Sequence, residues 1–141
     1  MDGARLGYGL AAPDNELDLP FLSQHCDVFY IGGTKVGALF GEAVVIANEE
    51  LKKDFRYFIK QKGGMLAKGR LLGIQFETLF EDNLYMEISK HAIRLAEKLR
   101  SAFLEKGYPM LVENRTNQIF PIIPDAVLEK LGENCLLYTS P

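Results

Sequence analysis

The chain has 141 residues, of which 48% are hydrophobic and 25% are charged, a balance typical of a soluble globular protein. Its formal net charge of -3 and its isoelectric point near 5.4 exclude the basic surface expected of a nucleic-acid-binding protein. No apolar run approaches the roughly 20 residues that a membrane span requires, and the N-terminus lacks the layout of a signal peptide. Cys26 and Cys135 form neither a disulfide framework nor a metal-ligand spacing, so we expect a cytoplasmic protein without a metal site.

Two short strands are predicted in the first half of the chain. Residues 17–26 favour a short helix that leads into a run of strand formers at residues 28–31. Gly32 and Gly33 end this first strand, because glycine breaks regular pairing and adopts backbone conformations closed to other residues. A second apolar run, at residues 42–47, predicts another buried strand.

The middle of the chain predicts helices. Asn48 caps a helix that runs to Lys62, with acidic residues in its first turn, and the Gly63-Gly64 pair ends it. Helical periodicity resumes over residues 65–80, where Gly69 and Gly73 share one side and predict close packing of a neighbouring element.

The strongest helical pattern covers residues 82–106, with Asp82 as its cap and Gly107 and Pro109 after its end. Strands are then predicted at residues 108–113 and 118–123, followed by a short helix at residues 126–131. The order of elements indicates an α/β fold, with a domain boundary near the Gly63-Gly64 pair. The apolar stripe of the long helix consists of Leu84, Ile88, Ala92, Leu95, Leu99 and Phe103.

Lys35 lies in the glycine-rich turn that follows the first strand. A lysine on a strained, partly dry turn can act as a nucleophile. Desolvation disfavours the ammonium form and lowers the pKa of the lysine, so that the neutral amine can attack a carbonyl group. The alternative is an ordinary solvated loop lysine. The turn is not a phosphate-binding P-loop, because the required spacing of glycines before Gly-Lys-Ser/Thr is absent.

Asp2 and Arg5 stand upstream in the sequence Asp-Gly-Ala-Arg. A carboxylate beside a cofactor's pyridine nitrogen keeps that nitrogen protonated, so that the ring accepts electrons, and an arginine binds a phosphate or carboxylate through two hydrogen bonds. Alone, such a tetrapeptide is more typical of a turn or a surface ion pair. We expect the ends of adjacent strands to bring Asp2 and Lys35 to one pocket.

Three motifs carry a resemblance to a known family. They are DGARLG from Asp2, DVFYIGGTKVGALFGE from Asp27 and GMLAKGR from Gly64. Over residues 2–131 the chain resembles the low-specificity threonine aldolases of the aromatic amino acid beta-eliminating lyase family. This resemblance implies an internal fragment of the pyridoxal-phosphate-dependent aspartate aminotransferase fold (fold type I). Residues 1–64 would end the large domain, residues 65–134 would form part of the small C-terminal α+β domain, and residues 135–141 would be an unrelated tail.

The resemblance also implies roles for individual residues. Lys35 is similar to the lysine that forms a Schiff base with pyridoxal 5'-phosphate, Asp2 to the partner of the pyridine nitrogen, and Arg5 to the arginine beside it that helps to hold the cofactor and the substrate carboxylate. Basic residues that the family places near the cofactor phosphate correspond to Lys60, Lys68 and Arg70. The lone histidines His25 and His91 are predicted to have packing or surface roles.

The implied reaction is cleavage of L-threonine or L-allo-threonine to glycine and acetaldehyde by a homodimeric or homotetrameric parent enzyme. The small-molecule partner is therefore an amino acid, with no nucleic acid and no membrane involved. Because an N-terminal portion and a C-terminal segment of the family are absent from this sequence, the isolated fragment is expected to be inactive. Two alternatives stay open: a pyridoxal-phosphate-dependent β-eliminating lyase acting on another amino acid, and a non-catalytic α/β fragment that mediates oligomer contacts.

Overall fold

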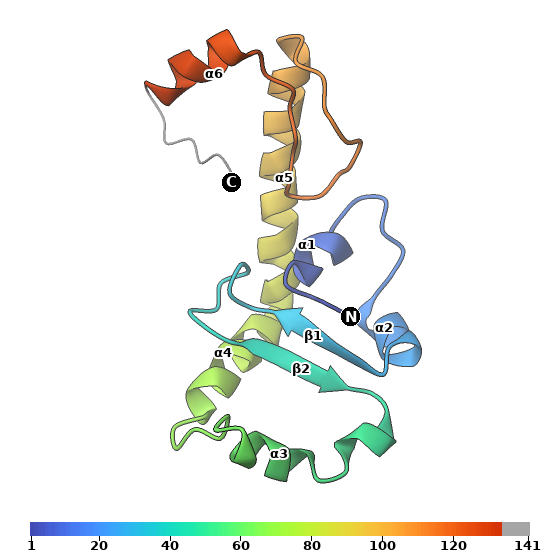
Figure 1. The fold of residues 1–141 in the computed structure, drawn as a ribbon. Coiled ribbons are helices and arrows are strands. Elements are labelled where there is room, and N and C mark those ends of the chain that lie inside the picture. Colours follow the sequence, from blue (N-terminus) through green and yellow to red (C-terminus); the bar gives the residue numbers. More distant parts are fainter. Residues whose placement is uncertain (134–141) are drawn as a thin grey trace.

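The computed structural model describes residues 1–133, so residue 134 and the predicted tail 135–141, with Cys135, lie outside the described residues. The short helices α1–α4 and the strands β1 and β2 lie around the lower part of one long helix, α5, whereas α6 lies at its upper end (Figure 1). The arrangement is the mixed α/β fold that the sequence predicts. The bounds in chain order are α1 Leu6–Leu10, α2 Leu19–His25, β1 Val28–Gly32, β2 Glu42–Ile46, α3 Phe55–Gln61, α4 Arg70–Phe80, α5 Leu84–Glu105 and α6 Asp125–Gly132, with 3-10 helices at Glu49–Lys52 and Glu81–Asn83.

The strands β1 and β2 form an antiparallel pair, which confirms both strands predicted in the first half of the chain. The N-terminal residues run along the other edge of β1. Met1 N donates a hydrogen bond to Val28 O at 2.7 Å, and Gly32 N donates one to Gly3 O at 2.9 Å. Because both segments advance in the same order between these two bonds, the N-terminal segment lies parallel to β1.

Gly3 makes this close approach possible. A Cβ at residue 3 would lie 1.6 Å from the backbone oxygen of Tyr30, a separation that no side chain tolerates. Any residue other than glycine would therefore push the N-terminal segment away from β1. The same contact brings residues 3 and 4 beside Gly32, at the end of β1 where the turn with Lys35 begins.

The core lies where α1 and the first half of α5 pack beside β1. Gly7 allows α1 to approach α5, since a Cβ there would lie 2.4 Å from the Ser89 side-chain oxygen. Tyr85, Ser89 and Ile93, spaced four residues apart, form the buried face of α5. The buried apolar side chains are Tyr8, Leu22, Phe29, Ile31, Val36, Ala38, Leu79, Tyr85 and Ile93.

The apolar stripe predicted for the long helix is only partly its buried face. Ile88 and Ala92 pack against the core, whereas Leu84, Leu95 and Leu99 are 40%, 50% and 52% exposed. The buried residues of α5 start at Tyr85, one residue after the start of the predicted stripe. Much of the second half of α5 is not covered by other described residues.

The helix predicted from Asn48 to Lys62 is divided in two. Asn48 does act as a cap, because its side-chain oxygen accepts a hydrogen bond from Glu50 N at 3.0 Å, but it begins only a 3-10 helix. Asp54, with φ at 57°, lies in the left-handed region and interrupts the regular spiral before α3. The close packing predicted at Gly73 is also wrong within the described chain, because nothing lies within 4 Å of a Cβ built there.

The start of α5 and the segment that follows α5 differ from the prediction as well. Asp82 has φ at 49° and does not cap the long helix, which begins at Leu84. The two strands predicted over residues 108–123 reduce to one bridge between Met110 and Pro121, with a hydrogen bond from Leu111 N to Phe120 O at 2.7 Å. Prolines in both segments lack the N–H groups that a longer ladder needs.

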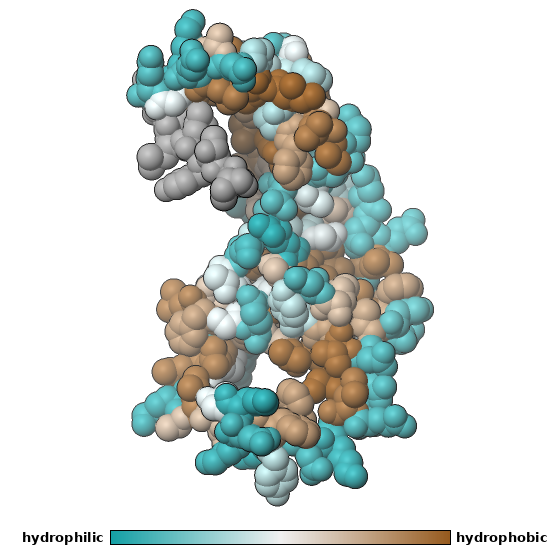
Figure 2. Space-filling view, in the orientation of Figure 1, coloured by the Kyte–Doolittle hydropathy of each residue, from teal (hydrophilic) through white to brown (hydrophobic). Residues whose placement is uncertain are grey.

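Much apolar surface remains uncovered in the described chain. Apolar side chains gather over the β2–α3 end and again over the α5–α6 end of the molecule (Figure 2). Leu39 is 85% exposed, Tyr57 76% and Leu111 69%. Within residues 1–133, no helix combines the length and the apolar character needed to cross a membrane.

Candidate functional site

The turn between β1 and β2 carries Lys35, and three side chains hold its backbone. Glu42 Oε2 accepts a hydrogen bond from Gly33 N at 2.7 Å, and Tyr85 donates its hydroxyl to Gly32 O at 2.9 Å. Tyr8 donates its hydroxyl to the backbone oxygen of Lys35 itself. These contacts come from β2, α5 and α1, so the turn is fixed to three separate elements.

The side chain of Lys35 is exposed, although its neighbour Val36 is completely buried. The turn therefore anchors its backbone through the core and directs the lysine side chain outwards. The partly dry setting predicted for this lysine is not formed by residues 1–133. The positive φ values at Gly37 and Gly41, 102° and 86°, account for the bent path of the turn.

The carboxylate of Asp2 is held by two hydrogen bonds at the edge of β1. The hydroxyl of Tyr30 donates to Asp2 Oδ1 at 2.5 Å, and Ala4 N donates to the same oxygen at 2.9 Å. These two hydrogen bonds are the main causes that hold the pKa of Asp2 below its ordinary value of 3.8, and the positive charges of Lys35 and of the N-terminus lower the pKa further. Asp2 is therefore charged at neutral pH.

Arg5 directly precedes α1, at the same end of β1. Its side chain is exposed and makes no hydrogen bond or ion pair within residues 1–133. Because residues 3 and 4 contact Gly32, Arg5 and the turn with Lys35 belong to one region of the molecule. This region holds the carboxylate of Asp2, the amine of Lys35 and the exposed guanidinium of Arg5.

The three basic residues expected near a phosphate lie farther along the chain. Lys60 lies in the last turn of α3, Lys68 in the turn before α4, and Arg70 is the first residue of α4. All three are exposed, and no hydrogen bond or ion pair of the described chain connects them with Asp2 or Lys35. Their role stays a prediction.

Several residues of this region were not found from the sequence. Glu42 had a weak signal, since it is a charged residue at the start of an apolar strand. Tyr8, Tyr30 and Tyr85 gave no local signal, because each acts on a residue at least 27 positions away.

Neither predicted packing histidine is part of this region. The ring of His25 stacks on Phe21 with centroids 3.9 Å apart, and His91 is an exposed residue whose ring nitrogen lies 3.4 Å from an Arg94 nitrogen. Cys26 is half-buried. Among residues 1–133, no group of three histidine, cysteine or acidic side chains is placed to hold a metal ion.

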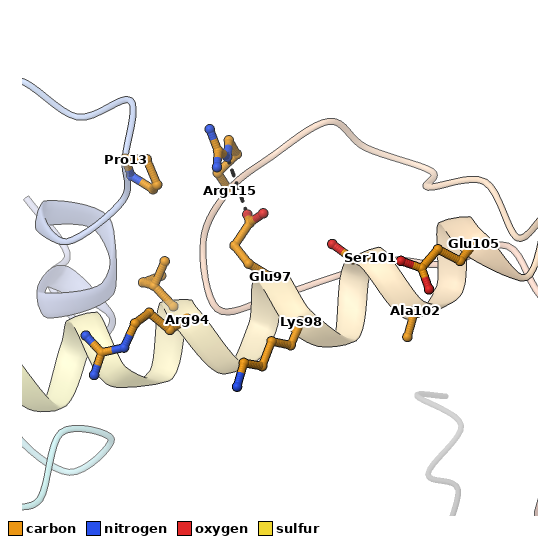
Figure 3. Close-up of a pocket in the computed structure, with 9 residues that line it drawn as sticks. Pro13, Arg94, Glu97, Lys98, Ser101, Ala102, Glu105 and Arg115 are labelled. Atoms are coloured by element: carbon orange, nitrogen blue, oxygen red, sulfur yellow. Dashed lines mark hydrogen bonds and ion pairs between the residues drawn. The ribbon is translucent and has the colours of Figure 1, made fainter.

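A cavity of about 670 Å³ lies along α5 and contains none of the predicted site residues. Figure 3 shows it between Pro13, the exposed side of α5 and Arg115, whose guanidinium lies 3.4 Å from a Glu97 carboxylate oxygen. The exposed residues Asp2, Arg5 and Lys35 lie outside this cavity.

The fold is similar to that of a solved enzyme structure. The structure matches that of a threonine aldolase of Leishmania major with a TM-score of 0.93 and 42% sequence identity, over 99% of this chain and 41% of that one. No family model matches the chain. The described residues therefore have the fold of one part of a pyridoxal-phosphate enzyme of fold type I, as the sequence predicts.

Sequence comparison shows which pyridoxal-phosphate enzymes of fold type I the chain is similar to. A low specificity L-threonine aldolase of Pseudomonas sp. (strain NCIMB 10558) is 33% identical over 106 residues, and one of Pseudomonas aeruginosa is 30% identical over 135 residues. The matches cover 74% and 93% of this chain but only 31% and 38% of those relatives. The chain is thus homologous to a segment of the low-specificity L-threonine aldolases, which confirms the resemblance predicted from its motifs.

Proposed function

We propose that this chain forms part of the active site of a pyridoxal-phosphate-dependent carbon–carbon lyase, which cleaves L-threonine or L-allo-threonine to glycine and acetaldehyde. The observation that carries the proposal is the contact of Gly3 and Ala4 with Gly32, which brings Asp2 and Arg5 to the end of β1 where the turn with Lys35 begins. The homology to threonine aldolases supports the choice of reaction.

The chemistry of the donor set fits pyridoxal phosphate. Oδ1 of Asp2 already accepts two hydrogen bonds, while Oδ2 accepts none within residues 1–133, so one carboxylate oxygen is available to a protonated ring nitrogen. Lys35 offers an exposed primary amine for the aldehyde. Arg5 offers an exposed guanidinium, unpaired within residues 1–133, for a phosphate or a substrate carboxylate.

Each residue has a distinct task in the proposed reaction. When bound, the cofactor supplies an electron sink for the negative charge left at Cα after the Cα–Cβ bond breaks. Asp2 would supply the negative charge that keeps a bound ring nitrogen protonated, and Lys35 would supply the amine that holds the cofactor aldehyde. Arg5 orients an anionic group. Glu42, Tyr8 and Tyr85 keep the backbone of residues 32–35 in place, so that the lysine amine returns to the same position after each cycle.

We also propose which residues bind the cofactor phosphate and that the parent protein is an oligomer. Lys60, Lys68 and Arg70 would hold the cofactor phosphate, with residues 1–64 completing a large domain and residues 65–134 entering a small one. A homodimer or homotetramer is proposed from the family resemblance. The apolar side chains that stay uncovered within residues 1–133 (Figure 2) form a surface that another segment or another subunit would cover.

Reductive trapping tests the proposed attachment. The chain is incubated with pyridoxal phosphate, reduced with borohydride and digested, and the modified lysine is found by mass spectrometry. We expect the label on Lys35 and its loss in Lys35→Ala, with Lys53→Ala, at an exposed lysine outside the proposed site, as the matched control that keeps the label on Lys35. Equal labelling of several lysines, or unchanged labelling in Lys35→Ala, would contradict the proposal.

A chimaera tests the reaction itself. In it this chain replaces the matching segment of the Pseudomonas aeruginosa relative, so that the remaining parts of the protein are present. Acetaldehyde release from threonine, lost in Lys35→Ala, is the expected result. Release of a keto acid without acetaldehyde would instead favour a β-eliminating lyase. A folded chimaera that attaches the cofactor but releases neither product would contradict both activities.

A further inference from the structure

The hydroxyl of Tyr30 is placed to orient Asp2. Phe29 and Ile31, its neighbours on β1, are buried in the core, so Tyr30 faces the opposite side of the strand. On that side its hydroxyl reaches Asp2 Oδ1 at 2.5 Å, across the parallel contact between β1 and the N-terminal segment.

The two hydrogen bonds to Asp2 converge on a single oxygen. Tyr30 and the backbone N–H of Ala4 both donate to Oδ1, from two directions and from two segments of the chain. A carboxylate held at one oxygen by two donors has little freedom to rotate, and its second oxygen, Oδ2, has no donor within residues 1–133. The arrangement therefore distinguishes the two oxygens: one is an anchor and the other is open to a partner.

We propose that Tyr30 is a positioning residue, which anchors Oδ1 of Asp2 so that Oδ2 is presented to the ring nitrogen of the cofactor. This inference rests on the proposed function, and it goes further by assigning a role to a residue outside the motif positions of Asp2, Arg5 and Lys35. Tyr30 acts through Asp2 and does not itself contact the reacting atoms.

The charges around this pair agree with such a role. The hydrogen bond to Asp2 is the main cause that raises the pKa of the Tyr30 hydroxyl above 10.0, and the same bond is the main cause that lowers the pKa of Asp2. Asp2 is therefore ionised and Tyr30 neutral over the whole neutral range. The other charges that act on the pair are Lys35, the N-terminal ammonium of Met1 and Glu42.

The first measurement needs no cofactor. Tyr30→Phe removes the hydroxyl and keeps the ring, and Tyr57→Phe is the matched control on an exposed tyrosine of α3. The carboxyl carbon of Asp2 is titrated by NMR in both variants and in the unchanged chain. We expect the titration midpoint of Asp2 to rise in Tyr30→Phe and to stay unchanged in Tyr57→Phe. Equal midpoints in all three chains would overturn the inference.

The second measurement uses the chimaera loaded with pyridoxal phosphate labelled with ¹⁵N in the ring. We expect the ring-nitrogen chemical shift to move toward the unprotonated value in Tyr30→Phe, and kcat to fall by roughly tenfold with KM nearly unchanged, as for the loss of one hydrogen bond to a charged group. If the cofactor attaches at Lys35 but the nitrogen shift in Tyr30→Phe equals that of the unchanged chimaera, the positioning role fails while the proposed function stands. If no cofactor attaches at Lys35, both fail.

Discussion

Glu42 Oε2 accepts a hydrogen bond from Gly33 N at 2.7 Å, so the first residue of β2 holds the first residue of the turn that carries Lys35. The same carboxylate lies 3.4 Å from the Thr34 hydroxyl through its other oxygen. One side chain thus ties together the two ends of a loop whose backbone must stay fixed while its lysine remains exposed.

Replacing Glu42 by alanine should loosen this turn. We expect Glu42→Ala to lower the free energy of unfolding by about 1 kcal/mol, because Gly33 N then loses its acceptor in a partly buried setting. Glu42→Gln keeps an acceptor oxygen and should lose less. Urea unfolding measures both, and borohydride trapping should show slower labelling of Lys35 in Glu42→Ala. Equal stability of the alanine variant and the unchanged chain would show that the contact has no structural effect.

The contact between the N-terminal segment and β1 depends on Gly3. We expect Gly3→Ala to lower the free energy of unfolding by about 2 kcal/mol or more, because its Cβ would lie 1.6 Å from Tyr30 O and the hydrogen bond to Gly3 O would be lost. Gly9→Ala, in α1, is the control. Nothing lies within 4 Å of a Cβ at that position, so it should be neutral or stabilising by about 0.5 kcal/mol. Chemical denaturation compares the two, and a larger loss in Gly9→Ala would contradict the described packing.

The hydroxyl of Tyr85 connects α1 to β1, since it accepts from Gly7 N at 3.0 Å and donates to Gly32 O at 2.9 Å. Tyr85→Phe should cost about 1–2 kcal/mol at neutral pH, because it leaves two buried backbone groups unpaired. Denaturant unfolding at pH 7 measures this cost, and a variant as stable as the unchanged chain would contradict the bridging role.

Tyr85 also predicts a dependence on pH. Burial raises the pKa of Tyr85 to about 12, from the ordinary 10.0. The folded state therefore holds this proton more tightly than the unfolded state, and the resulting stability is fully present below pH 10 and lost as the pH rises from 10 toward 12. The unfolding free energy of Tyr85→Phe should fall less steeply over that interval. Parallel curves for the two proteins would show that this tyrosine does not titrate as a buried group.

Arg100 joins the second half of α5 to the segment that follows it. Its guanidinium lies 2.6 Å from a Glu113 carboxylate oxygen, and the arginine side chain is 18% exposed. Glu113→Ala should cost about 1 kcal/mol, since a largely buried charge loses its partner. Glu49→Ala removes the ion pair with Lys52, whose side chains are 83% and 45% exposed, and should cost less than about 0.5 kcal/mol. Unfolding at low and high salt compares the two variants; equal costs would contradict the docking of this segment on α5.

The sequence by itself determined the local elements and the residues of the motifs. The strands predicted at residues 28–31 and 42–47, the short helix predicted over residues 17–26 and the glycine-rich turn around Lys35 depend on neighbouring residues, so local patterns predicted them. The family resemblance followed from the same contiguous motifs. Neighbouring residues were not enough at Asp54 and Asp82, where left-handed backbone divided or shortened predicted helices.

Only the tertiary structure decided which side chains hold Asp2 and the turn with Lys35 in place. The hydrogen bond from Tyr85 to Gly32 joins residues 53 positions apart, and that from Tyr30 to Asp2 joins residues 28 apart. Such pairs leave no periodic pattern in the sequence. They form because buried polar groups need hydrogen-bond partners, which here come from segments that pack side by side. The buried face of α5 also depends on tertiary structure, because α1 and α4 pack against it.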